Sequence, residues 1–333
     1  MTTTQDCSIG IGVESTFKTA VTVGRFLEFT DESLDWSKSV KQGQGLRVGS
    51  RVARSGRRTV PTADGGGDIT VELASKGLGL LLNAGFGAYT SSLVSGTTYQ
   101  QVHTLGDTLP SLTIQKGVVQ AGGTVDALTF LGCTVSQLEF DFPNGDICTM
   151  KASIDAADVS TVQAYASPSY PAGTVNLFHF AGGTVSTGTI TPATATALAS
   201  AATPTANIRS GNVQISHNLR NDRFNFGGAG RKARQLAGLR TITGKFEIEY
   251  DSTTYRDLVL SDSPLSVLLN FTAGALSTGL ETFQLALPDI RFEGELPKAN
   301  GNDLIVQSMS FTALDPLTAA PITAVTRTSD SAL

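Results

Sequence analysis

The chain has 333 residues, of which 40% are hydrophobic and 16% are charged, and its formal net charge is −5. This length accommodates one large or two medium domains with a buried core. No apolar stretch reaches the roughly 20 residues that a transmembrane helix needs, and the 3 cysteines lack the spacing of a metal site or a disulfide framework.

Alternating apolar and polar residues predict strands in the first half of the chain. In DITVEL (68–73), three apolar side chains point to one face and three polar side chains to the other. QLEFDF (137–142) has the same alternation. Between these segments, SKGLGLLLNAG (75–85) predicts a short helix, although each glycine in a helix interior costs about 1 kcal/mol relative to alanine.

The second half has the same kinds of segment. KFEIEY (245–250) and DIRFE (289–293) alternate as strands do, and STTYRDLVLSD (252–262) predicts a short helix. The halves are joined by residues 165–210, which are rich in Pro, Thr and Ala and carry almost no charge. Within this stretch, NLFHF (176–180) is a candidate for the opening strand of the second half.

The two halves are similar to each other, which indicates an internal repeat. At a constant offset of 177 residues, Gly67 aligns with Gly244 and Glu72 with Glu249. Four further pairs of segments keep their order in both halves. These pairs are Ser33–Val40 with Asn212–Leu219, Leu109–Ile114 with Ser263–Leu269, Val135–Pro143 with Pro288–Pro297, and Asp146–Ala156 with Asp303–Ala313.

We therefore expect a mainly β chain with two tandem domains, each with a short flanking helix. The predicted division assigns 1–165 to the first copy with an N-terminal arm, and 166–210 to a linker that includes a possible first strand of the second copy. It assigns 211–320 to the second copy and 321–333 to a flexible C-terminal tail.

Positive charge is concentrated in the same loop of each copy. Residues 47–58 carry five arginines and no acid, and residues 220–240 carry six basic residues and one acid, so each segment has a net charge of +5. The rest of the chain is then −15, because −5 minus 10 is −15. The basic side chains are Arg47, Arg51, Arg54, Arg57 and Arg58 in the first loop, and Arg220, Arg223, Arg231, Lys232, Arg234 and Arg240 in the second.

Three interpretations of these loops are open. The first is a solvated charge run on a flexible loop. The second is binding of nucleic acid through phosphate contacts, which does not explain the acidic remainder of the chain. The third is self-association, in which the basic loop of one subunit contacts the acidic face of the next. We favour the third interpretation because it uses both signs of charge.

The polar faces of the predicted strands are mostly acidic. One interpretation of these faces is an ordinary solvated outer surface. The other, in which they line a channel, is implied by the resemblance described next and concerns 68–73 and 245–250 first of all. The candidates are Asp68, Thr70, Glu72, Glu139, Asp141, Lys245, Glu247, Glu249 and Glu293.

Four segments resemble the tail tube proteins of long, flexible-tailed bacteriophages. They are IGIGVESTFKTAVTVGRFLEFTDESLDW (9–36), GGDITVELASKGLGLLL (66–82), LPSLTI (109–114) and GCTVSQLEFDF (132–142). The resemblance implies tail-tube-type domains, each a β-sandwich or half-barrel with a short flanking helix. It also implies that their sheets close a ring around a channel, and that the rings stack through the long loop after the first strand. Most members form hexameric rings from one domain per chain, so a duplicated chain implies a trimeric ring with pseudo-sixfold symmetry, with a hexamer as the alternative.

The resemblance also implies a location and partners. The protein would be part of the virion tail after assembly in the host cytoplasm, and would contact a tape-measure protein, tail-tip and tail-terminator proteins, and passing DNA without sequence-specific binding. The alternative is a tandem β-sandwich binding module, such as an adhesin or a tail-decorating protein. We predict no membrane contact.

The sequence offers no group of residues with the pattern of a catalytic site. His103, His179 and His217 do not belong to a metal or triad motif, and GIGVES (10–15) lacks the third glycine and the lysine of a nucleotide-binding loop. We therefore predict a structural protein that is not an enzyme and needs no cofactor.

Overall fold

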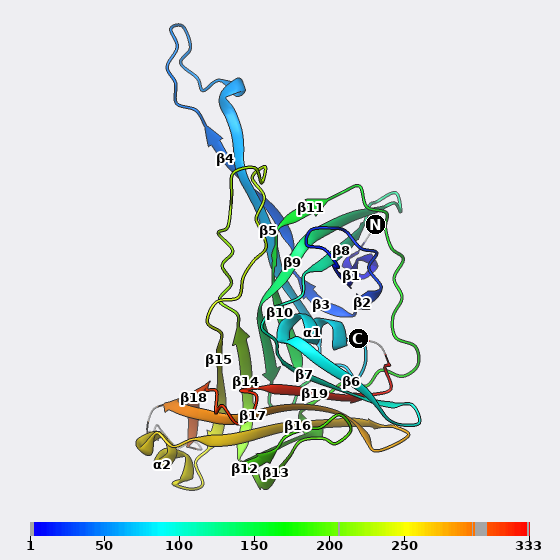
Figure 1. Cartoon of the computed structure of the whole chain (residues 1–333), viewed down its shortest axis with the longest axis vertical. Coiled ribbons are helices and arrows are strands. Elements are labelled where there is room, and N and C mark those ends of the chain that lie inside the picture. The colour runs from blue at the N-terminus through cyan, green and yellow to red at the C-terminus, as the bar shows by residue number, and fades with distance from the viewer. Residues whose placement is uncertain (1–2, 206, 295, 297–304, 332) are drawn as a thin grey trace.

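A computed structural model describes residues 3–205, 207–294, 296, 305–331 and 333. The described chain is mainly β, which confirms the predicted fold class (Figure 1). Two short helices occur in the described part, α1 (Gly79–Phe86) and α2 (Thr254–Ser261). The strands of the first half are β1 (Ser8–Val13), β2 (Arg25–Leu27), β3 (Phe29–Glu32), β4 (Asp35–Gln42), β5 (Arg58–Glu72), β6 (Gly87–Ser95), β7 (Thr98–Leu105), β8 (Leu112–Val119), β9 (Val125–Phe142), β10 (Thr149–Ala156) and β11 (Asp158–Ser160). Those of the second half are β12 (Gly183–Thr191), β13 (Ser200–Thr205), β14 (Ile208–Ser216), β15 (Thr241–Glu249), β16 (Leu265–Ala275), β17 (Leu280–Gly294), β18 (Val306–Ala313) and β19 (Thr323–Thr328).

A central antiparallel sheet runs through both halves of the chain. Its order is β3 and β4 beside β5, then β10, β9, β14, β15, β18 and β17. The junction between the halves is the pairing of β9 with β14, from Gly211 opposite Phe142 to Ser216 opposite Gln137. One polypeptide therefore forms a continuous sheet from two similar sets of strands.

Two outer sheets cover the apolar face of the central sheet. The first has the order β2, β1, β8, β9 and β11, and the second has the order β6, β7, β19, β17, β16, β12 and β13. The long strands β9 and β17 bend, so that one end of each lies in an outer sheet and the other end in the central sheet. Aromatic side chains fill the space between the layers, including the stacked pairs Phe142–Phe271 and Phe246–Phe311.

The same order of pairing occurs in each half. Strand β5 pairs with β10, β10 with β9, β9 with β8 and β8 with β1; likewise β15 pairs with β18, β18 with β17, β17 with β16 and β16 with β12. The two aligned glycines, Gly67 and Gly244, lie where a neighbouring strand approaches too closely for a side chain. A Cβ at Gly67 would collide with the carbonyl oxygen of Ser33, and a Cβ at Gly244 would collide with that of Asn212. Ser33 and Asn212 are themselves the first residues of two aligned segments.

The two halves differ in what is added to the common strands. The hairpin β6–β7 follows α1, whereas α2 leads directly to β16. Helix α1 is buried along its whole length, while Tyr255 is the buried residue of α2. The aligned segments that reach Pro297 and Asp303 extend outside the described residues. The domain boundaries drawn from the sequence stay a prediction.

Two expectations about the connecting and terminal segments are wrong. Residues 183–191 and 200–205 of the predicted linker form β12 and β13, and β12 rather than 176–180 takes the place that β1 has in the first half. The predicted flexible tail contains β19, which lies between β7 and β17 with Ile322 and Val325 fully buried. Apolar alternation in TAVTRT is too short to distinguish such a strand from a polar tail.

Two histidines lie in the core, and the ring nitrogens of His103 have no hydrogen-bond partner among the described residues. His103 is packed against Phe86 and Tyr89, and His217 lies near the positive charge of Arg240. Burial lowers the pKa of each to about 4, and Arg240 adds to this effect at His217. Both imidazoles are therefore neutral in the folded chain at pH 7.

We expect the folded chain to lose stability as the pH falls from about 6.5 to about 4. In this pH range the histidines are protonated in the unfolded chain but stay neutral in the folded chain. Each histidine therefore lowers the free energy of unfolding by up to about 3 kcal/mol. Urea unfolding across this pH range measures the effect. The variant His103→Leu with His217→Leu should have a flatter profile, whereas His179→Gln, which changes an exposed residue, should follow the original chain. An equal slope in all three chains would contradict the assignment.

Candidate assembly surfaces

The nine predicted channel residues lie on one face of the central sheet. In each strand the neighbouring positions are buried in the core, so the face that carries them points to solvent. The register aligns them in rows across both halves. One row is Thr70, Lys151, Glu139, Gln214, Thr243, Thr312 and Arg291, and the next is Glu72, Thr149, Asp141, Asn212, Lys245, Ser310 and Glu293.

Charges on this face are partly balanced by neighbours. Lys151 Nζ lies 2.8 Å from an Asp68 carboxylate oxygen, and the Ser153 hydroxyl donates to the same carboxylate at 2.7 Å. Partial burial opposes the ionisation of Asp68, but these contacts outweigh it and lower its pKa. At Asp141 the opposite occurs: burial and the nearby Glu139 raise the pKa. The middle of the face therefore has an excess of negative charge.

Several polar residues of this face were missed by the sequence analysis. Lys151 and Ser153 come from β10, where TMKASIDA alternates as clearly as the strands that were used. The uncharged members, such as Gln214 and Ser310, lie on β14 and β18. The alternation of apolar and polar residues in these strands could have identified them. They were missed because the prediction was based on acidic side chains, and most of these residues carry amides or hydroxyls.

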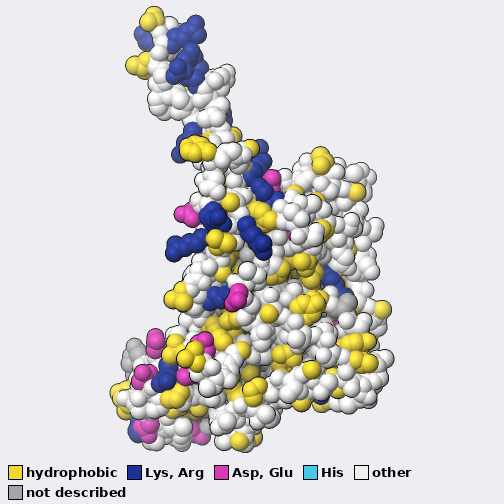
Figure 2. Space-filling view, in the orientation of Figure 1, with side chains coloured by type: hydrophobic (Ala, Val, Ile, Leu, Met, Phe, Trp, Pro, Cys, Tyr) yellow, Lys and Arg dark blue, Asp and Glu magenta, His cyan; other side chains and the backbone are white. Residues whose placement is uncertain are grey.

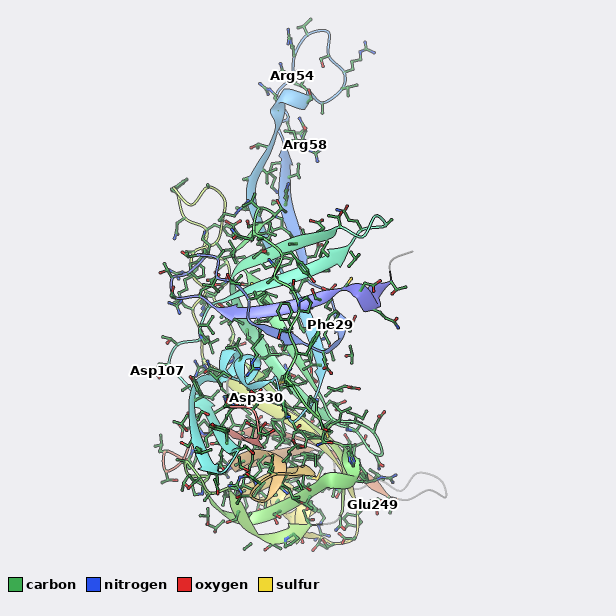
Figure 3. All side chains as sticks on the ribbon, turned by 90° about the vertical axis from the view of Figure 1, so that its right-hand side faces the viewer. Phe29, Arg54, Arg58, Asp107, Glu249 and Asp330 are labelled. Carbon is green, nitrogen blue, oxygen red and sulfur yellow. The ribbon has the colours of Figure 1, made fainter. Side chains whose placement is uncertain are left out.

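The first basic loop projects from the molecule as an arm, which we define as residues 38–63 (Figures 1 and 3). It consists of the ends of β4 and β5, a short 3-10 helix (Ser55–Arg57) and the tip between them. The five predicted arginines lie on it, and Lys and Arg gather there in Figure 2. Its tip also exposes three aliphatic side chains almost completely: Leu46 (101%), Val48 (101%) and Val52 (81%).

The second basic loop, residues 217–240, lies against the first half of the same chain. Lys232 is only 3% exposed and forms ion pairs with Asp155 and, at 3.1 Å, with Asp64. Arg231 donates to Asp158 at 2.7 Å, and Arg234 donates to the carbonyl oxygen of Leu109. Lys232 therefore differs from the prediction, because a buried residue with two acidic partners is not available to another subunit.

The other basic residues of this loop keep more exposure. Arg220 is exposed, while Arg223 and Arg240 are half-buried. Arg223 donates to the carbonyl oxygen of Arg234. Burial lowers the pKa of Arg240, and the negative charge of Asp107 opposes this effect. The loop thus fastens the two halves together and presents positive charge at its surface.

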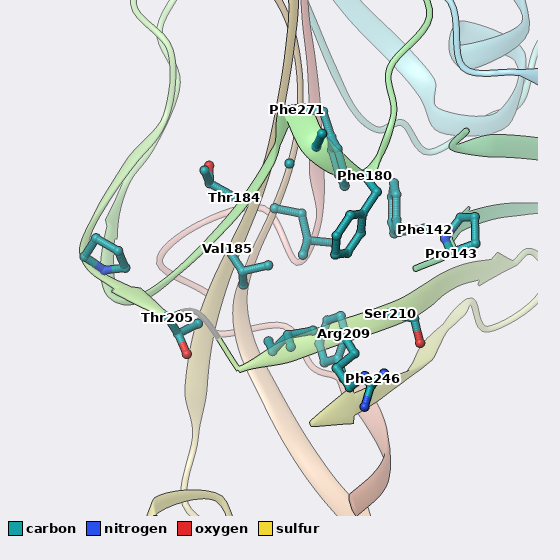
Figure 4. A pocket seen from close by; sticks show the side chains of 16 residues that line it. Phe142, Pro143, Phe180, Thr184, Val185, Thr205, Arg209, Ser210, Phe246 and Phe271 are labelled. Carbon is teal, nitrogen blue, oxygen red and sulfur yellow. The ribbon is translucent and has the colours of Figure 1, made fainter. Parts of the chain in front are cut away.

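An apolar pocket of about 500 Å³ opens beside β12 and β14 (Figure 4). Phe142, Phe180, Phe246 and Phe271 contribute most of its aromatic lining. Among the described residues that line it, Arg209 is the one ionisable side chain. The pocket therefore offers apolar contacts without the paired titratable groups that acid–base chemistry requires.

The described residues contain no cluster of three or more His, Cys, Asp or Glu side chains that could hold a metal ion. None of the helices in this part of the chain is both long and apolar enough to cross a membrane.

One comparison with known proteins gives a match. The sequence model of a family described as phage tail tube protein matches residues 4–313, which is nearly the whole chain. No curated protein matches the chain.

Proposed function

The chain belongs to the phage tail tube protein family, and from this premise we propose that it is a subunit that assembles into stacked rings around a channel for DNA. The family makes it a structural component of a phage tail. The observation that supports ring formation most directly is the continuous central sheet, in which two similar sets of strands already lie side by side.

The free edge of the central sheet supports assembly of further copies. Residues 32–37, which run from the end of β3 into β4, occupy the place that 211–216 of β14 occupy in the second half. The edge of β14 pairs with β9, whereas no strand of the described chain pairs with the outer edge of β3 and β4. An unpaired edge is a template for a strand of another chain. We favour a ring of three chains with pseudo-sixfold symmetry, with six chains as the alternative.

The polar face of the central sheet would line the channel of such a ring. Its acidic excess repels the phosphates of DNA weakly, and its many amides and hydroxyls carry no positive charge that would hold DNA in place. In this proposal DNA passes without sequence-specific binding. A tape-measure protein occupies the channel during assembly in the host cytoplasm, and tail-tip and tail-terminator proteins bind the two ends of the tube.

The tip of the arm would contact the next ring. It combines Arg47 and Arg51 with three exposed aliphatic residues, and such apolar side chains gain free energy when a neighbour covers them. Acidic side chains gather at the opposite end of the molecule in Figure 2. This separation of charge favours head-to-tail stacking of copies.

We expect the variant Arg47→Glu with Arg51→Glu to form rings that do not stack into tubes. The changes reverse charge at the tip, where both side chains are exposed, and therefore leave the fold and the sheet edges intact. Negative-stain electron microscopy of the purified chain, with and without this change, tests both the tube and the role of the tip.

A control that also reverses a positive charge is Lys76→Glu, which lies outside the arm and outside helix α2 at the acidic end. This control should form tubes as the original chain does. Failure of the original chain to form rings or tubes at any concentration would contradict the proposed function. Normal tubes from the tip variant would contradict only the role of Arg47 and Arg51.

A further inference from the structure

The arm and loop 217–240 are corresponding hairpins in the two halves of the chain. The alignment of the two halves places Lys41 with Arg220 and Thr59 with Leu236. In the arm, Lys41 pairs with Thr59; in the loop, Arg220 pairs with Leu236. The hairpins therefore share their register. It follows that Arg54 corresponds to Arg231, and Ser55 to Lys232, at the offset of 177 residues.

The surface on which loop 217–240 lies also has a counterpart in the second half. The aligned strands β10 and β18 place Ala156 with Ala313, so Asp155 corresponds to Thr312 and Asp158 to Asp315. Hydrogen bonds confirm this correspondence. Ala157 donates its N–H to the carbonyl oxygen of Leu131 at 3.1 Å, and Leu314 donates to that of Asp289 at 2.9 Å.

The residue types at the two surfaces change together. The pair Arg231–Asp158 has the counterpart Arg54 and Asp315, which conserves both charges. The buried group of Lys232, Asp155 and Asp64 has the counterpart Ser55, Thr312 and Thr241, in which all three charges are replaced by hydroxyls. If the arm and its counterpart surface faced only solvent, the lysine and its two acidic partners would not need to be replaced together. Matched replacement is what a retained contact requires, because an unpaired buried charge is costly.

Both counterpart surfaces are uncovered in the single chain. Ala157 is fully buried, whereas its counterpart Leu314 is 46% exposed, and Leu317 beside it is 90% exposed. Asp315 is exposed and makes no ion pair with any described residue. Arg231 uses its Nε to bind Asp158, but the Nε of Arg54 is buried without a hydrogen-bond partner in the described part of the chain.

The partner of the arm must belong to another molecule. The arm extends from β4 and β5 at one edge of the central sheet, while Asp315 follows β18 near the other edge. Four strands of the same sheet, β10, β9, β14 and β15, lie between β5 and β18 in the described chain. A second copy placed beside the first, as β14 is placed beside β9, brings the two surfaces together.

We propose that the arm of each chain lies on the second half of a neighbouring copy, with Arg54 paired to Asp315 of that copy. This inference rests on the proposed function, because it assumes rings in which neighbouring chains continue the central sheet. The contact lies within the ring and leaves the tip of the arm available to the next ring. One counterpart pair is less favourable. The Thr134 hydroxyl donates to the Gln235 side chain, and the corresponding residues are Arg291 and Arg58, which carry the same charge. The ion pair of Arg291 with Asp289, at 3.1 Å, reduces this repulsion.

A charge exchange tests the proposed pair. We expect Arg54→Asp alone and Asp315→Arg alone to raise the protein concentration required for ring formation at least tenfold. The double variant should restore assembly, because it re-forms the pair with the charges reversed. Sedimentation and negative-stain microscopy measure assembly, and thermal unfolding of the monomers checks that each variant folds. Single variants that assemble normally, or a double variant that fails while its monomer is folded, would overturn the inference.

Chemical coupling gives a second measurement. In the variant Arg54→Lys, a zero-length carbodiimide should join the introduced amine to the Asp315 carboxylate of another chain, and the linked peptides are identified by mass spectrometry. Adding Asp315→Asn should abolish this product. Rings without the product would overturn the inference and leave the proposed function standing, whereas the absence of rings in the original chain would count against both.

Discussion

A chain that ends at Pro321 is expected to lose its cooperative folding, because it lacks β19. This strand pairs with β17 on one side and with β7 on the other, so its removal opens the outer sheet in the middle. It also removes the buried side chains of Ile322 and Val325, and the expected loss is about 5 kcal/mol or more. Circular dichroism during heating, together with the fraction of soluble protein, measures the effect.

A chain that ends at Asp330 is the matched control. It keeps β19 and the contacts that Asp330 makes with the Gly77 N–H at 3.1 Å and with Arg25 at 3.0 Å. We expect this control to unfold cooperatively within a few degrees of the full chain. If the chain that ends at Pro321 also unfolds as the full chain does, then β19 contributes little to stability, and the expectation of a flexible tail is supported instead.

The central strands could be predicted from the sequence because each has one buried and one solvent-exposed face. The alternation of Ile69 and Val71 with polar residues follows directly from this environment. Strand β19 is different, since it lies inside a sheet yet contains Thr and Arg. Arg327 remains compatible with that position because its guanidinium binds the Gln100 side chain and the Thr196 carbonyl. Such compensation comes from residues far away in the sequence.

The basic loops show the same limit for the assembly surfaces. Both loops have a net charge of +5, and the sequence gives no reason to treat them differently. One is an exposed arm, and the other binds the first half through Lys232. The acidic partners Asp64 and Asp155 are 168 and 77 residues away, since 232 minus 64 is 168 and 232 minus 155 is 77. Only the folded arrangement shows that this lysine meets them.

The internal repeat converts this difference into information about assembly. Loop 217–240 of the second half contacts the first half of the same chain. The corresponding arm of the first half has no such surface within the described part of its own chain, so the equivalent contact requires another copy. The correspondence of Arg54 with Arg231 was present in the sequence at the same offset as the paired glycines. The strand register of both hairpins shows that the two arginines occupy equivalent positions in the folded chain.

The substitution Lys232→Met should destabilise the folded chain by about 3–5 kcal/mol, because it leaves Asp155 buried without its cation. Burial already raises the pKa of Asp155, and Lys232 opposes that rise. Without the lysine this pKa rises further above that of the unfolded chain, so the loss is greatest at neutral pH. It should shrink as the pH falls through the raised pKa of Asp155, because the folded chain then takes up the proton. Urea unfolding at several pH values measures the difference between variant and original chain.

Two further variants separate the buried charge from other effects of the change. Arg231→Met removes the more exposed pair with Asp158 and should cost no more than about 1 kcal/mol. Adding Asp155→Asn to Lys232→Met should recover most of the lost stability, because the amide can be buried without a counter-charge. A cost below about 1 kcal/mol for Lys232→Met, independent of pH, would mean that water reaches Asp155 and that the loop is held to the first half by its other contacts.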